Sequence, residues 1–235
     1  IRTYIENSVP YIGTEIPRMD RIDGTGIKIA VIDTGVDFNH PDLFGWGPDG
    51  KVIGGHNFIE ENQLPMDTNG HGTKVAGIIA ADGNTLGVAH KAKILAYKVS
   101  EDGEGVSSEL ITKAIEKAIE DKADIINISL GVNKTNSKID SAVNHAWDNG
   151  IFVVTAAGND GPELKTIGSP GRNFESITVG ATYNNMTSSL IAILEIDETQ
   201  YTVIPMVGSS KTQEPIIEKI VFGGFGKNSD LENLD

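Results

Sequence analysis

Three polar residues stand where apolar runs of the sequence give way to glycine-containing turns. Asp33 ends the run "GIKIAVID", His71 lies between two glycines in "NGHGTKVAG", and Asn159 follows "VVTAAG". Each residue alone also suits an ordinary turn or an exposed surface position. Together, however, a carboxylate can fix the tautomer of an imidazole, the imidazole can act as a general base, and an amide can stabilise an oxyanion.

The elements around these residues alternate between strand and helix patterns. Apolar, β-branched runs predict strands over 26–36, 92–100, 124–131 and 151–160, and helical spacing predicts helices over 70–81, 107–123 and 137–150. Such alternation predicts an α/β fold, with a mostly parallel sheet and helices on both faces. Ligands bind beyond the carboxyl ends of the strands in such sheets, and this is where Asp33 and Asn159 fall.

Composition excludes several classes of protein and site. The 235 residues carry a formal net charge of −14, which disfavours binding to nucleic acid phosphates. The absence of cysteine excludes disulfides and thiolate chemistry. No apolar run approaches the roughly 18 residues of a membrane span. We therefore expect neither a nucleic acid partner nor a membrane span in this chain.

Four blocks of the sequence together resemble one enzyme family. The stretches "VIDTGVDFNHPDL", "NGHGTKVAG", "ISLG" and "AAGND" occur in the order, and near the spacing, of the conserved blocks of the subtilisin-like serine proteases, or subtilases. The resemblance implies a subtilisin-like fold and an endopeptidase that uses an Asp-His-Ser triad. It makes Asp33 the orienting carboxylate, His71 the general base and Asn159 the oxyanion donor.

The same resemblance implies how a polypeptide substrate would bind. Gly103 and Gly105 would approach the substrate as an added strand, in which main-chain hydrogen bonds supply affinity and pockets supply specificity. The walls of the primary specificity pocket would come from Ser129, Leu130, Gly131, Ala156, Ala157 and Gly158. Export to the cell surface or the medium also rests on the family and not on composition.

The serine of the triad is missing from these 235 residues. The family carries it in a Gly-Thr-Ser block at the start of a late helix, and the sequence contains no such block. Ser169 in "IGSPG" and Ser209 in "VGSSK" are weaker alternatives, since neither precedes an apolar helix. We therefore predict that the chain is an N-terminal fragment, inactive alone, of a longer protease.

The last part of the chain differs from a compact subtilase. After residue 183 the sequence continues with strand-like pieces, Pro205, Pro215 and the pair Gly223-Gly224, which indicate a β-rich unit. It resembles the beginning of a protease-associated (PA) domain, an insertion found in many larger subtilases. We predict residues 1–183 as the first part of the catalytic domain and 184–235 as an incomplete inserted domain; a family-specific hairpin is the alternative.

No metal site is predicted. The histidines lack the spacing of a metal hydrolase. Smaller bacterial subtilases bind calcium through an aspartate that matches Asp42 and through carbonyl groups of a following loop, but the loop 82–85 is shorter here. Calcium requires about 6–8 oxygen ligands, so it stays open only as an alternative.

Two other functions are open at this stage. A non-catalytic subtilase homologue would use the same groove as a peptide-binding module. A nucleotide-binding α/β domain would need a Gly-x-Gly-x-x-Gly turn after the first strand, and "DTGVDFNHPDL" does not contain one.

Overall fold

The computed structural model describes residues 9, 11–103, 106–161, 163–181, 192–196 and 199–203. The chain divides into two compact units, Ile1–Asn184 and Asn185–Asp235. Each unit is described separately below. The division of the chain into two domains near residue 183 remains a prediction.

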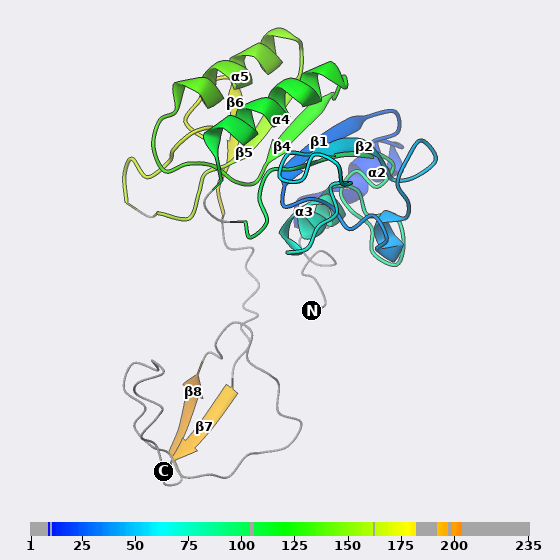
Figure 1. Cartoon of the computed structure of the whole chain (residues 1–235). Helices are drawn as coiled ribbons and strands as arrows, with labels where there is room; N and C mark the ends of the chain where they lie inside the picture. The colour runs from blue at the N-terminus through cyan, green and yellow to red at the C-terminus, as the bar shows by residue number, and fades with distance from the viewer. Residues whose placement is uncertain are drawn as a thin grey trace. The chain divides into compact units, whose positions relative to one another are not determined.

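The first unit is built on a six-stranded parallel sheet with strand order β2-β3-β1-β4-β5-β6 (Figure 1). Parallel pairing aligns the last residue of β1, Asp33, with Lys98 at the end of β3. The polar ends of neighbouring strands therefore meet at one edge of the sheet. The strands are β1 (Lys28–Asp33), β2 (Val52–Asn57), β3 (Lys93–Lys98), β4 (Ile125–Ile128), β5 (Phe152–Ala156) and β6 (Ser176–Val179).

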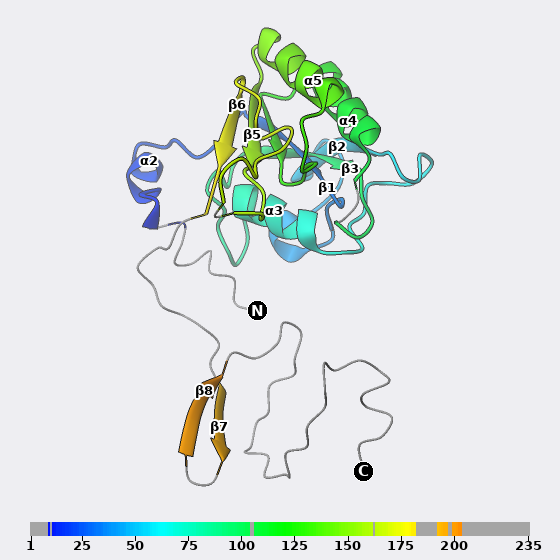
Figure 2. The same ribbon diagram turned by 90° about the vertical axis from the view of Figure 1, so that its left-hand side faces the viewer.

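Helices cover both faces of this sheet, as predicted. Helices α4 (Ser108–Glu120) and α5 (Ser137–Asp148) lie on one face, and α3 (His71–Ala80) lies on the other (Figure 2). Alternate residues of β1 explain the two layers: Ala30 and Ile32 pack into the core with α4 and α5, whereas Ile29 and Val31 pack into the core with α3. The central strand is therefore buried on both faces.

The sequence pattern missed four short elements of the first unit, one of which is strand β6 (Ser176–Val179). Strand β2 (Val52–Asn57) was not predicted, because Gly54 and Gly55 interrupt its apolar pattern. A short helix, α2 (Glu15–Met19), and a 3-10 helix, η1 (Pro41–Leu43), were also not predicted. Strand β2 lies at the edge of the sheet beside β3, and in the sequence it lies between β1 and α3.

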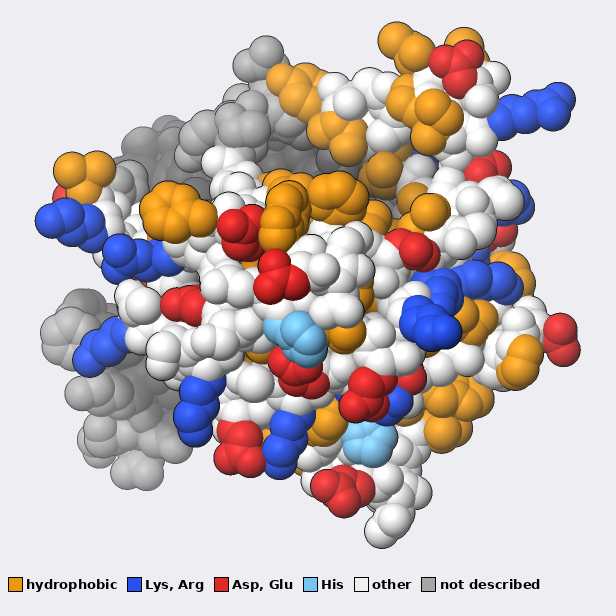
Figure 3. Space-filling model, turned by 90° about the horizontal axis from the view of Figure 1, so that it is seen from above, with side chains coloured by type: hydrophobic (Ala, Val, Ile, Leu, Met, Phe, Trp, Pro, Cys, Tyr) orange, Lys and Arg blue, Asp and Glu red, His pale blue; other side chains and the backbone are white. Residues whose placement is uncertain are grey.

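Strands β5 and β6 leave large apolar side chains exposed. Phe152, Ile177 and Val179 are each about half exposed, although parallel sheets are ordinarily covered on both faces. Seen from above relative to Figure 1, apolar side chains gather in several clusters between acidic and basic ones (Figure 3). The exposed strands offer a surface on which a further layer of protein can pack.

In the second unit, the described residues form one antiparallel pair of strands, β7 (Ala192–Ile196) and β8 (Thr199–Val203). The predicted β-rich insertion is not seen as a complete unit, and Pro205, Pro215 and Gly223-Gly224 lie outside the described residues. Across the described parts of both units, no helix has the length and apolar character needed to cross a membrane.

Candidate active site

Asp33 and His71 meet at the carboxyl edge of the sheet. Asp33 ends the central strand β1, and His71 is the first residue of α3. Asp33 Oδ1 and His71 Nδ1 are 2.7 Å apart. The aspartate is fully buried, whereas the side chain of His71 is 49% exposed. This geometry fixes Nδ1 on the carboxylate and leaves the other edge of the imidazole accessible.

Glycines permit this close approach of helix and strand. Gly70, which precedes α3, has a φ of 98°, a conformation that L side chains rarely adopt. A Cβ atom on Gly72 would lie 2.1 Å from Gly35 O and 3.0 Å from Asp33 Cβ. The two glycines that flank His71 therefore serve different purposes: one allows the turn and the other allows contact.

The carboxylate of Asp33 is held in a dry environment. Burial raises its pKa above the usual carboxyl value, and the hydrogen bonds with His71 and from Thr34 N oppose that rise. Its second oxygen, Oδ2, is buried without a hydrogen-bond partner among the described residues. A buried acceptor of this kind is costly for folding and typical of functional sites.

A groove of about 680 Å³ opens beside the Asp33–His71 pair. It brings together segments that lie far apart in the sequence: the end of β1, the start of α3 and the residues that follow β3, β4 and β5. All the predicted site residues that the structure describes line this groove: Asp33, His71, Gly103, Ser129, Leu130, Gly131, Ala156, Ala157, Gly158 and Asn159. Gly105 lies outside the described residues.

The two predicted pocket walls follow neighbouring strands. The wall 129–131 directly follows β4, and the wall 156–158 begins at Ala156, the last residue of β5. A Cβ atom on Gly131 would lie 2.7 Å from Ser169 O, so this wall is packed closely against the 168–171 loop. Gly158 has a φ of 88°, which turns the chain just before Asn159.

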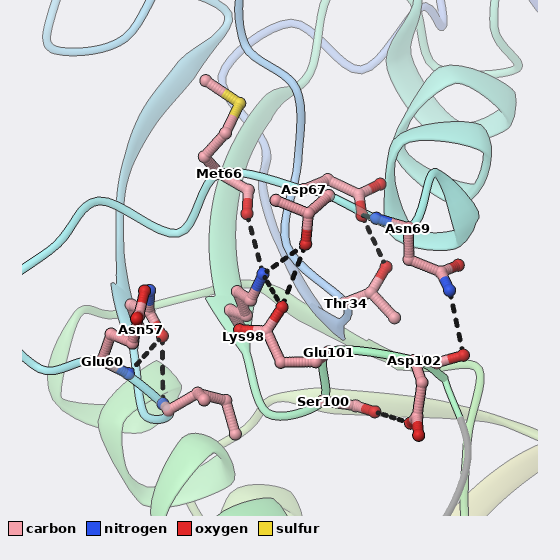
Figure 4. A network of polar contacts seen from close by, with 12 residues as sticks. Thr34, Asn57, Glu60, Met66, Asp67, Asn69, Lys98, Ser100, Glu101 and Asp102 are labelled. Carbon is pink, nitrogen blue, oxygen red and sulfur yellow. Dashed lines mark hydrogen bonds and ion pairs between the residues drawn. The ribbon is translucent and has the colours of Figure 1, made fainter.

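A polar network that reaches the groove through Asn69 and Asp102 was not predicted from the sequence (Figure 4). The ammonium of Lys98, whose side chain is almost fully buried, donates to Met66 O and Thr68 Oγ1 and pairs with Glu101 at 3.0 Å. Asn69 Nδ2 donates to Asp102 O at 2.9 Å. These contacts join the loop before His71 to the loop that carries Gly103. A lysine in a strand gives no signal of such burial, so composition and spacing could not reveal it.

Comparison with known proteins identifies the family. Residues 24–231 match the sequence profile described as the subtilase family. The chain belongs to the subtilases. This subtilase is 34% identical to the minor extracellular protease Vpr of Bacillus subtilis over 98% of its own length, and 41% identical to the major intracellular serine protease of the same species over 68%.

A solved structure, that of sphericase, resembles the fold of this subtilase. It superposes with a TM-score of 0.56 and 34% sequence identity, over 77% of this chain and 59% of that one. The match spans 30% of the length of Vpr and 52% of the length of the intracellular protease. The likeness thus covers part of each relative.

Ser169, one of the two serines considered from the sequence, is buried in the lining of the groove. Only 1% of the Ser169 surface is exposed, and its hydroxyl accepts a hydrogen bond from Asn136 N at 2.8 Å. The other serine considered from the sequence, Ser209, lies outside the described residues. Within the described part of the chain, no hydrogen bond is made to Nε2 of His71.

The residues around Asp42 do not fit the calcium site of the smaller bacterial subtilases. Asp42 Oδ1 accepts a hydrogen bond from Asn84 N at 2.7 Å, and Asp42 O accepts one from Asp82 N at 3.0 Å. Gly83 lies so close that a Cβ atom there would be 2.2 Å from Asp42 Oδ1. The carboxylate of Asp82 faces Lys91 at 2.9 Å. Protein donors thus occupy Asp42 Oδ1, Asp42 O and the carboxylate of Asp82.

Proposed function

We propose that this chain is part of a subtilisin-type serine endopeptidase whose nucleophilic serine lies outside these 235 residues. The observation that carries the proposal is the 2.7 Å contact between Asp33 Oδ1 and His71 Nδ1 at the mouth of a long groove. Family membership supports it. Because the serine is missing, the chain alone is expected to be inactive.

In the proposed reaction, His71 Nε2 takes the proton of the serine hydroxyl while the serine oxygen bonds to the carbonyl carbon of the peptide. The carbonyl electron pair moves onto oxygen, and the side-chain amide of Asn159 donates a hydrogen bond to that oxyanion. Asp33 holds the imidazole in the required tautomer and stabilises the imidazolium. Collapse breaks the C–N bond, and His71 returns the proton to the leaving amine. Water then hydrolyses the acyl-enzyme.

The substrate would be an extended polypeptide. Gly103 and Gly105 would pair with its backbone, and the two walls 129–131 and 156–158 would receive one of its side chains. Glycine, alanine and serine make up a large share of the groove lining, beside polar residues such as Asp102 and Asp160. This composition suits binding through the substrate backbone.

We also propose that a further part of the catalytic domain covers the exposed face of β5 and β6 and brings the serine to His71. The half-exposed Phe152, Ile177 and Val179 support this proposal, because a parallel sheet is stable when both faces are covered. We also propose that a PA-type domain is inserted between residue 184 and the serine. The match to Vpr over nearly the whole chain is consistent with it.

We also propose that the protein is exported from the cell. The printed name of Vpr places that protein outside the cell, whereas another relative is named as intracellular. Fractionation of the native organism, with this protein detected by antibody in medium, envelope and cytoplasm, tests the proposal. Detection in the cytoplasm alone would refute export without affecting the enzymatic proposal.

The decisive experiment uses the protein at its full natural length. We expect a fluorophosphonate probe to label one serine outside these residues, and we expect His71→Ala to abolish both labelling and cleavage of a peptide substrate. Peptide binding without labelling or turnover would instead favour the non-catalytic binding module. Absence of a Gly-Thr-Ser block from the complete reading frame would lead to the same conclusion.

A further inference from the structure

Asp67 lies four residues before His71, in the loop that leads into α3. Both oxygens of its carboxylate accept hydrogen bonds. Oδ1 accepts from Thr34 Oγ1 at 2.9 Å, from Asn69 N at 2.9 Å and from Gly70 N at 2.8 Å. Oδ2 accepts from Thr73 N at 2.9 Å and from Thr73 Oγ1 at 2.5 Å. The Asp67 side chain therefore binds the residue that follows β1 and residues that precede and follow His71 in the chain.

Thr34 completes the connection from the strand side. Its hydroxyl donates to Asp67 and accepts from Gly72 N at 3.0 Å. Thr34 follows Asp33 directly, and Gly72 follows His71. The neighbour of the carboxylate is thus bonded to the neighbour of the imidazole, and both Thr34 and Gly72 are buried.

Helix α3 depends on these two side chains for its cap. An N-cap side chain ordinarily accepts from the second or third amide of its helix, but the N-cap residue here is Gly70, which has no side chain. Two side chains from outside the helix take this role. Thr34 accepts the hydrogen bond of Gly72 N, and Asp67 accepts that of Thr73 N. The start of α3 is therefore fixed relative to β1 rather than by its own sequence.

We propose that Asp67, acting with Thr34, is a positioning residue that fixes the imidazole of His71 against Asp33. Asp67 is not among the described residues that line the groove, so it would act without contacting substrate. In the described part of the chain, Asp33 is the hydrogen-bond partner of the His71 ring. The orientation of that ring consequently depends on where α3 begins. This inference rests on the proposed function for its kinetic test only.

The kinetic test compares three variants of the full-length protease. Asp67→Asn replaces two acceptor oxygens by one oxygen and a donor group that opposes the donors of Thr73. Thr34→Val removes the hydroxyl, and Thr34→Ser retains it. Since a misplacement of about 1 Å can cost roughly 100-fold in rate, we expect Asp67→Asn and Thr34→Val to lower kcat by about 10- to 100-fold with little change in KM. Thr34→Ser should restore most of kcat.

A control separates positioning from simple loss of stability. Ile115→Val removes one carbon from the core beneath α4 at a residue that does not line the groove, and it should lower the melting temperature while leaving kcat unchanged. Kinetics are measured at a temperature at which every variant is folded by circular dichroism. A kcat within twofold of wild type in both Asp67→Asn and Thr34→Val would refute the proposal, as would an equal loss in Thr34→Ser.

A spectroscopic test does not depend on turnover. With ¹⁵N-labelled histidine in the full-length protein, the proton on His71 Nδ1 should give a resolved downfield signal in the wild type, assigned by its loss in His71→Ala. We expect that signal to weaken or disappear in Asp67→Asn and Thr34→Val and to persist in Thr34→Ser and Ile115→Val. An unchanged signal in Asp67→Asn would refute positioning. An inactive wild type that still shows this pattern would refute only the proposed function.

Discussion

Asp33 Oδ1 lies 2.7 Å from His71 Nδ1, and 38 positions in the sequence separate the two residues. The contact joins the end of a strand buried on both faces to the first turn of a helix. It exists because Gly72 lets α3 approach β1 to a distance that any Cβ atom would prevent. The pair is therefore a consequence of backbone packing as much as of the two side chains.

Gly72→Ala should disrupt this contact. The added methyl group would meet Gly35 O at 2.1 Å, so α3 must move away from β1. We expect a loss of stability of about 1–3 kcal/mol, typical of an overpacked core, and loss of the Nδ1 proton signal of His71. Gly77→Ala, in the same helix, is the matched control, because a Cβ atom there meets nothing within 4 Å. It should be neutral or stabilising by up to about 1 kcal/mol in urea unfolding.

Asp33→Asn should leave the fold intact and remove most of the activity of the full-length protease. An amide cannot hold His71 in the required tautomer or stabilise the imidazolium, and in other serine proteases this change lowers kcat by roughly 10⁴-fold. Steady-state kinetics on a peptide substrate checks the expectation. Asp148→Asn, an exposed carboxylate of α5, should keep full activity. Comparable losses in both variants would point away from the assigned role.

Asn159→Ala tests the oxyanion assignment. If the side-chain amide donates only to the oxyanion, the change should lower kcat by about 10²–10³-fold, a magnitude known from the corresponding residue of subtilisin, with KM nearly constant. Asn39→Ala, at an exposed position outside the groove lining, is the control. A rise in KM with unchanged kcat would assign Asn159 to substrate binding instead.

Much of this arrangement could be predicted because its residues lie at the ends of strongly patterned elements. The run rich in isoleucine and valine that ends at Asp33 predicts a strand end, and the apolar spacing after His71 predicts a helix start. Parallel pairing then places such ends together. Strand β2 was missed for the opposite reason, since Gly54 and Gly55 break its pattern while pairing with β3 still stabilises it.

The supporting polar network could not be predicted in the same way. Lys98 looks like an exposed residue of strand β3, yet its side chain is buried against Met66 O and Glu101. Asp67 lies in the turn-rich segment "DTNG", where an aspartate ordinarily caps its own loop. Its bonds to Thr34 and Thr73 depend on the approach of β1 and α3, which no local pattern specifies. The sequence indicated the candidate catalytic residues but not the residues that hold them in place.

The stability contributed by Asp67 should depend on pH. Burial disfavours the charged carboxylate, but hydrogen bonds from Gly70, Thr73 and Asn69 outweigh it and hold the pKa of Asp67 below its usual value. A lowered pKa in the folded state stabilises the protein above the unfolded pKa of about 3.9, and this contribution is lost as pH falls through the folded pKa. The difference in unfolding free energy between wild type and Asp67→Asn should therefore be full at pH 7 and shrink steadily below about pH 4. Urea titrations at several pH values measure it, and a difference that grows on acidification would contradict the assigned shift.

Chelation of calcium should not act through the loop around Asp42. Asp42 Oδ1 is already bonded to Asn84 N, and the facing carboxylate of Asp82 is paired with Lys91. Asp42→Asn keeps an acceptor oxygen for Asn84 but removes the charge that a calcium ion would need. We therefore expect the melting temperature of Asp42→Asn to lie close to that of the wild type both with calcium and with EDTA. Asp42→Ala, which removes the acceptor, should lower the melting temperature equally in both conditions, because it leaves Asn84 N without its partner. A stabilisation by calcium that is present in the wild type and lost in Asp42→Asn would instead place an ion at this loop.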